Sequence, residues 1–94
     1  MTMMNIVEPR LRWFVRQMKE KLKQNEYKSD WRKLSTKKNM KAIKDELREL
    51  SFELFGYDEN FNNGDSVIDE CADVANRAMM LADLVKSQYK GKKP

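Results

Sequence analysis

Apolar residues recur at the spacing of an α-helix in three separate segments of the chain. The first set follows Pro9, which is tolerated at a helix start, and predicts a helix over residues 10–25; it consists of Leu11, Phe14, Val15, Met18 and Leu22. The second set predicts a helix that begins after a capping residue, Ser35 or Thr36, and ends at Gly56. Its apolar residues are Met40, Ile43, Leu47, Leu50 and Leu54. Residues 26–34 carry no apolar periodicity and are expected to form an ordered connection.

The third segment carries two apolar rows on one helix, which Asp65 or Ser66 caps and which extends to about Tyr89. One row consists of Val67, Cys71, Val74, Ala78, Leu81 and Val85. The other, about 100° around the helix, consists of Ile68, Ala72, Ala75, Met79 and Ala82. Such a helix needs neighbours on two sides, and small residues allow a helix of another subunit to approach closely. We therefore predict an all-α fold with a bundle of three main helices per chain, assembling into a four-helix-bundle-type homo-oligomer, either a dimer or a tetramer.

Length and composition narrow the class of protein. The 94 residues fit a single domain, 1–94, with an ordered core of about 9–89 and short flexible termini. The chain lacks both a membrane-spanning apolar stretch and the apolar region of a signal peptide, so we expect a cytoplasmic protein with no membrane partner. It contains no histidine and a single cysteine, Cys71. This composition excludes Ser-His and Cys-His catalysis, HExxH zinc sites and zinc sites built from several thiolates.

The net charge of +4 combines two oppositely charged parts of the chain. Residues 1–44 hold 13 lysines and arginines against four acidic residues, a net charge of +9. Residues 45–85 hold only Arg48 and Arg77 against 11 acidic residues, a net charge of −9. One interpretation is a basic surface for a polyanion beside an acidic surface for cations. The other is two solvated faces that attract each other.

Four carboxylates occupy positions from which they can meet. Glu46 and Glu49 are three residues apart in the second predicted helix, and Glu70 and Asp73 are three apart in the third. Each pair lies roughly 90° to 100° from the centre of its apolar stripe, so antiparallel packing of the stripes brings all four to one rim of the interface. Because such carboxylates repel one another unless a hard divalent cation takes their oxygens, we predict a metal site here. Glu53, one turn after Glu49, is a candidate extra ligand or water-orienting base.

The same residues carry a family resemblance. Glu46-x-x-Glu49, followed by Glu70-x-x-Asp73, resembles the ExxE…ExxD signature of the MazG-like all-α nucleoside triphosphate pyrophosphohydrolases. The sequence of residues 73–83, DVANRAMMLAD, is similar to the run DVANFAMMIAD of small bacterial and phage members. The spacing M-x-x-K-L-x-x-N-x-x-K-x-x-W of that subgroup is matched by Met18, Lys21, Leu22, Asn25, Lys28 and Trp31. The resemblance covers about residues 14–83, with Arg77 in place of an aromatic residue and Asp45 in place of the usual Glu.

This resemblance implies a helical dimer, or a pair of dimers, that binds Mg²⁺ and cleaves a nucleoside triphosphate into monophosphate and pyrophosphate. Carried over by position, the metal ligands would be Glu46, Glu49, Glu70 and Asp73. Mg²⁺ would lower the pKa of a water that attacks phosphorus, and Glu49 or Glu53 would accept its proton. The expected substrate-binding residues are Lys21, Asn25, Lys28, Trp31, Asn76 and Arg77. Four of them have structural alternatives: Lys21 and Lys28 could be only solvated, Trp31 could cover the edge of the core and Asn76 could bridge helices.

Two other functions are compatible with the sequence. The basic first half, with Trp13, Tyr27 and Trp31 interleaved, would suit a small nucleic-acid-binding helical protein, but the acidic second half argues against a nucleic-acid partner. A catalytically silent module that binds a nucleotide or a protein would keep the same bundle. Nucleic-acid binding would be metal-independent and steeply salt-dependent, whereas a silent module would bind nucleotide without turnover.

Overall fold

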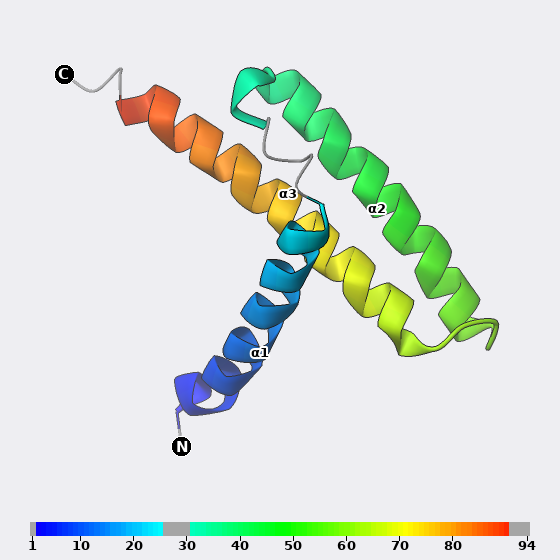
Figure 1. Cartoon of the computed structure of the whole chain (residues 1–94). Helices are drawn as coiled ribbons and strands as arrows, with labels where there is room; N and C mark the ends of the chain where they lie inside the picture. The colour runs from blue at the N-terminus through cyan, green and yellow to red at the C-terminus, as the bar shows by residue number, and fades with distance from the viewer. Residues whose placement is uncertain (1, 26–30, 91–94) are drawn as a thin grey trace.

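The structure, a computed structural model, describes residues 2–25 and 31–90, and within these ranges its regular elements are all helical (Figure 1). Helix α1 spans Met3–Gln24, α2 spans Thr36–Asp58 and α3 spans Gly64–Lys90. Helices α2 and α3 run antiparallel along each other, and the C-terminal part of α1 crosses the middle of α3. The all-α prediction is therefore confirmed for the described residues. In these ranges, no helix is both long and apolar enough to span a membrane.

Helix α1 begins seven residues before the predicted start at residue 10. Thr2 caps it, because its side-chain oxygen accepts a hydrogen bond from the backbone N–H of Asn5 at 3.4 Å. Pro9 thus lies inside the helix, where it cannot donate to the carbonyl of Asn5. The prediction that Pro9 marks the helix start was wrong, because the cap at Thr2 starts the helix earlier.

The turn between α2 and α3 also differs from the prediction. Ser35 caps α2 as expected, accepting from the N–H of Lys38 at 3.1 Å, but the helix continues through Gly56 to Asp58. Asn60, with φ of 64°, supplies the left-handed residue that had been expected at Gly56. Gly56 leaves room for the side chain of Asn62 instead, since a Cβ there would lie 2.5 Å from Nδ2 of Asn62 and would displace that amide. The cap of α3 is Asn63, whose side-chain oxygen accepts from the N–H of Asp65 at 2.9 Å.

Two buried asparagines hold the helices in place. Nδ2 of Asn39 donates to the carbonyl oxygens of Trp31 and Ser35, both at 3.0 Å, and so ties the short 3₁₀ turn of residues 31–33 to α2. Nδ2 of Asn76 donates to the carbonyl oxygen of Met18 at 2.9 Å, and so joins α3 to α1. Both amides are almost fully buried, where an unmade hydrogen bond is costly. The Asn76 bond therefore helps to hold α1 against α3, and the Asn39 bonds hold the turn that precedes α2.

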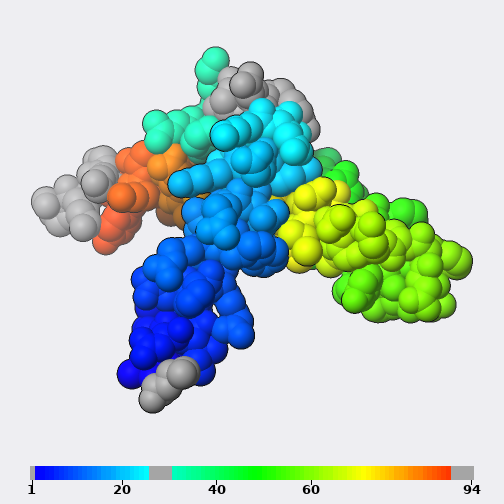
Figure 2. All heavy atoms as spheres, turned by 60° about the horizontal axis from the view of Figure 1, so that its bottom comes forward, coloured from blue at the N-terminus to red at the C-terminus, as the bar shows by residue number. Residues whose placement is uncertain are grey.

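The buried apolar core is small and lies between the helices near the crossing. Among the described residues it consists of Ile43, Ala72, Met80 and Leu84. The N-terminal half of α1 extends away from α2 and α3 as a separate arm, seen in blue in Figure 2. Exposed apolar residues of this arm are Met3, Met4, Ile6, Leu11, Trp13 and Val15. The radius of gyration of 15.6 Å exceeds the value of about 12 Å for a compact domain of this length.

Candidate metal centre and adjoining pocket

Three glutamates from two helices form a cluster. Glu46 and Glu49 lie one turn apart on α2, and Glu70 faces them from the antiparallel α3. One carboxylate oxygen from each lies within 4.8 Å of the corresponding oxygens of the other two. The buried positions of α2 are Asn39, Ile43 and Glu46, whereas Met40, Leu47 and Leu54 of the predicted stripe are exposed. The glutamates converge because Glu46 lies on the buried side of α2, so the prediction that the carboxylates would lie beside the packed stripe was wrong. Three of the four predicted metal ligands therefore gather at one point.

The electrostatics of the cluster oppose full ionisation. The pKa of Glu70 is raised to about 7, first by burial and then by the negative charges of Asp73, Glu49 and Glu46. The pKa of Glu49 is also raised, by partial loss of hydration and by the neighbouring Glu46. Oε2 of Glu70 is buried and has no hydrogen-bond partner among the described residues. A cluster of carboxylates that repel one another, with one buried oxygen that has no hydrogen-bond partner, has the chemistry that suits a hard divalent cation.

Asp73, the fourth predicted ligand, lies beside this cluster and turns toward α1. Its Oδ2 lies 3.7 Å from Nζ of Lys21, and its Oδ1 accepts a hydrogen bond from Nδ2 of Asn25 at 3.3 Å. The side chain of Asp73 is only 8 % exposed. The predicted meeting of all four carboxylates is therefore incomplete, because Asp73 pairs with a lysine that α1 carries across α3. The negative charge of Asp73 still acts on the cluster, because it contributes to the raised pKa of Glu70.

An open concavity of about 570 Å³ adjoins the cluster on the α2 side. Its lining residues are Asp45, Arg48, Glu49, Phe52, Glu53 and Glu70. Glu53, the second predicted base, lies in this wall, where Nδ2 of Asn62 donates to its Oε2 at 3.1 Å and to its carbonyl oxygen at 3.3 Å. The concavity is where solvent and solutes reach Glu49 and Glu70.

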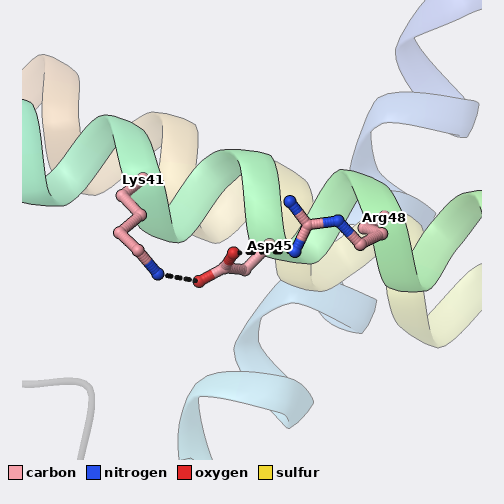
Figure 3. A network of polar contacts seen from close by, with 3 residues as sticks. All are labelled: Lys41, Asp45 and Arg48. Atoms are coloured by element: carbon pink, nitrogen blue, oxygen red, sulfur yellow. Dashed lines mark hydrogen bonds and ion pairs between the residues drawn. The ribbon is translucent and has the colours of Figure 1, made fainter.

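Arg48 is held at the edge of this concavity by a small ion-pair network (Figure 3). Oδ1 of Asp45 lies 3.2 Å from Nη1 of Arg48, and Oδ2 of Asp45 lies 3.2 Å from Nζ of Lys41. The hydrogen bond from Lys41, together with the charges of Lys41 and Arg48, lowers the pKa of Asp45. Asp45 therefore stays ionised and keeps two cations on one face of α2.

The other predicted substrate-binding residues are distributed around α1 and α3. Trp31 is partly buried, and the guanidinium of Arg32 lies 5.7 Å from its ring centroid. Asn76 donates its hydrogen bond to the backbone of Met18, which favours the helix-bridging alternative for Asn76. Arg77 is partly buried, and its Nε has no hydrogen-bond partner among the described residues. Lys28 lies outside the described residues. The roles of Lys21, Asn25, Lys28, Trp31 and Arg77 toward a substrate stay predictions.

Sequence reasoning missed three residues around the cluster: Arg48, Phe52 and Asn62. The signal for the first two was present in the helical period, because positions 48 and 52 lie on the same side of α2 within one turn of Glu49. Asn62 had no such signal, since its contact with Glu53 depends on how the turn after α2 folds back.

Comparisons with known proteins add no relative: no family model, no curated protein and no solved structure matches the chain. The MazG-like resemblance therefore rests on the residues quoted for it and stays a prediction.

The glutamate cluster predicts an unusual dependence of stability on pH. Glu70 has a folded pKa of about 7 against an ordinary value of 4.5, so between these values the unfolded chain releases a proton that the folded chain retains. In the absence of divalent cations, the melting temperature should fall as the pH rises from about 5 to about 8, and Mg²⁺ should restore it most at the higher pH. The chain has no histidine to titrate in this window, and Glu49, whose pKa is also raised, acts in the same direction as Glu70.

Thermal unfolding in EDTA and in MgCl₂ across this pH range measures the effect. Glu70→Gln is the control variant, because it removes the group with the pKa of about 7 and should weaken the dependence. A melting temperature that rises with pH in EDTA would contradict the prediction.

Proposed function

We propose that this protein is a Mg²⁺-dependent nucleotide pyrophosphohydrolase that cleaves ribo- or deoxynucleoside triphosphates into monophosphate and pyrophosphate. The observation that carries the proposal is the convergence of Glu46, Glu49 and Glu70, with carboxylate oxygens within 4.8 Å of one another. These are the positions at which the sequence resembles the ExxE…ExxD signature. The proposed setting is the cytoplasm.

The proposed ligands of Mg²⁺ are the three clustered glutamates, with Asp73 as the fourth carboxylate beside them. When bound, Mg²⁺ would neutralise charge on the phosphate oxygens and acidify an attacking water. The side chains that can accept a proton from this water are Glu49 and Glu53, because both line the open concavity. Asn62 restricts Glu53 to one orientation by its hydrogen bond to Oε2. Lys21 and Asn25, which contact Asp73, are proposed to face the phosphates from the α1 side.

The proposal is tested by incubating the purified chain with each of the eight common ribo- and deoxynucleoside triphosphates, with Mg²⁺ or with EDTA. We expect pyrophosphate and nucleoside monophosphate in a 1:1 ratio from at least one of them, and only with Mg²⁺. No pyrophosphate release from any of them would overturn the enzymatic function. Nucleotide binding without turnover would favour the silent-module alternative.

We further propose that the chain works as a homodimer. The chain exposes 7346 Å², whereas a compact monomer of 11.2 kDa exposes about 5,700 Å². The excess, about 1,600 Å², is roughly twice the 800 Å² that each partner buries in an interface of standard size. The buried apolar core of residues 2–25 and 31–90 is small for a domain of this length, which supports burial against a second copy.

The arm of α1 carries the surface proposed for this contact. Met4, Leu11 and Val15 share one side of the helix and line a concavity of about 500 Å³ with Glu8, Arg12, Arg16 and Lys19 at its edges. The partner surface proposed for the second copy lies on α3, where Met79 and Val85, one from each apolar row, are half-exposed. Pairing of these surfaces would give the four-helix-bundle-type arrangement expected from the two apolar rows of α3.

A further inference from the structure

The wall of α2 beside the glutamate cluster combines a cation and an aromatic ring that are both exposed. The side chain of Arg48 is 78 % exposed and Phe52 is 75 % exposed. Both line the same concavity as Glu49 and Glu70. A guanidinium can bind an anion and an exposed ring can stack on a planar group, so this combination suits an anionic, planar ligand once a cation neutralises the carboxylates that line the same concavity.

Arg48 can leave its present partner at small cost. Its ion pair with Asp45 is exposed, and such pairs contribute little to stability. Lys41 stays within 3.2 Å of Asp45, so the carboxylate keeps a cation when Arg48 moves. The pair of Lys21 and Asp73 differs, because both side chains are largely buried and its separation would leave a buried charge. Arg48, which lines the concavity, can therefore exchange its carboxylate partner for a phosphate at lower cost than Lys21 can.

Phe52 lies four residues after Arg48 and therefore on the same side of α2. Its ring has no ring partner among the aromatic contacts of the described residues. An exposed ring at the edge of a concavity offers a flat face on which any nucleobase can stack. The distance along the helix between positions 48 and 52 is about 6 Å, which is within the reach of a nucleotide that spans from phosphates to base.

We propose that a nucleoside triphosphate lies along this face of α2, with its phosphate chain on the guanidinium of Arg48 and its base on the ring of Phe52. The inference rests on the proposed function for the identity of the ligand, and it names two binding residues that the family resemblance does not assign. A guanidinium binds phosphate oxygens through two parallel N–H donors, whereas stacking on Phe52 does not distinguish one base from another.

The test compares Arg48→Ala and Phe52→Ala with two matched controls. Lys41→Ala removes a cation that pairs with the same Asp45 but does not line the concavity. Phe55→Ala removes an exposed ring on α2 that does not line it either. Two readouts are measured for each variant: steady-state pyrophosphate release with Mg²⁺, and equilibrium binding of dATP, dCTP, dGTP and dTTP by calorimetry with Ca²⁺ in place of Mg²⁺.

For Arg48→Ala we expect the KM and the dissociation constant of each triphosphate that the chain binds to rise about tenfold, with kcat within about threefold of the unsubstituted chain. Arg48→Lys should recover part of this loss, because the charge returns without the planar fork. Phe52→Ala should raise the same constants about fivefold, by a similar factor for each base. Lys41→Ala and Phe55→Ala should leave them unchanged.

The outcomes separate the two proposals. If the unsubstituted chain binds a triphosphate without cleaving it, the proposed function fails, and the binding constants of the variants still decide the inference. Turnover with unchanged constants for Arg48→Ala and Phe52→Ala would overturn the inference and leave the function standing. Equal losses for the control variants would also overturn it, because the effect would then come from net charge or general packing. A chain that neither binds nor cleaves any triphosphate would refute both.

Discussion

Replacing Glu49 by Gln is expected to lower the rate of Mg²⁺-dependent pyrophosphate release by about 100-fold or more. The variant keeps the shape of the side chain and loses a charged oxygen that the proposed cation needs. It also removes one of the two side chains placed to accept a proton in the concavity. Initial rates at saturating Mg²⁺, with the best triphosphate of the substrate panel, measure this loss.

The same variant is expected to be more stable than the unsubstituted chain when metal is absent. The pKa of Glu49 is raised in part by the charge of Glu46, so removal of the charge at position 49 relieves repulsion in the cluster. A lower rate together with a higher melting temperature in EDTA would distinguish a lost metal ligand from a damaged fold. A rate above a tenth of the original would contradict the assignment of Glu49.

Asp58→Asn is the matched control for Glu49→Gln. Asp58 is an exposed carboxylate at the last position of α2 and lies outside both the cluster and the concavity. Its neutralisation changes the net charge by the same amount, so it should leave both the rate and the metal-free melting temperature nearly unchanged. A comparable loss of rate in this control would mean that net charge, and not the position of Glu49, sets the activity.

Replacing Leu11 by Glu is expected to convert the proposed dimer into a monomer and to lower its melting temperature by about 10 °C or more. Leu11 lies in the apolar stripe of the α1 arm, and a carboxylate there would have to be buried without a partner in the proposed interface. Light scattering after size exclusion should change from twice the chain mass of 11.2 kDa to that mass. The unsubstituted chain should also melt at a higher temperature when its concentration is raised, because dissociation accompanies unfolding.

Gln24→Glu adds the same charge at an exposed position at the other end of α1, so it should leave the dimer intact. A monomeric mass for the unsubstituted chain at micromolar concentration would refute the dimer. A dimer that persists in Leu11→Glu would refute the assignment of the interface to this arm.

How far the fold was predictable differs from one helix to the next. The position of α2 and its cap at Ser35 were predicted correctly, because apolar periodicity and capping are local properties of the chain. The periodic residues are Met40, Ile43, Leu47, Leu50 and Leu54. The ends near Pro9 and Gly56 were predicted wrongly. At the first end the side chain of Thr2 caps the helix earlier than Pro9, and at the second the backbone turns at Asn60, beyond Gly56.

The candidate site divides in the same way. The meeting of Glu46, Glu49 and Glu70 was predicted from their spacing on two antiparallel helices. The side of α2 that is buried was not predicted, because it carries Glu46 itself and leaves Met40, Leu47 and Leu54 exposed. The partners of Asp73 could not be predicted from helical spacing. Lys21 lies in α1 and Asn25 caps its C-terminus, about 50 residues earlier in the chain. The concavity that unites Arg48 and Phe52 with Glu70 likewise required the second helix to be in place.

The sequence by itself determined the three helices, the absence of histidine chemistry and the pairing of carboxylates on two helix faces, because these depend on residue types and on spacings within a few turns. Only the tertiary structure decided which carboxylate turns to a lysine, which side of the cluster opens to solvent and how much of α1 stays uncovered. Those features depend on the angle at which α1 crosses α3, which the buried contact of Asn76 with the backbone of Met18 helps to hold. Local periodicity carries no information about that angle.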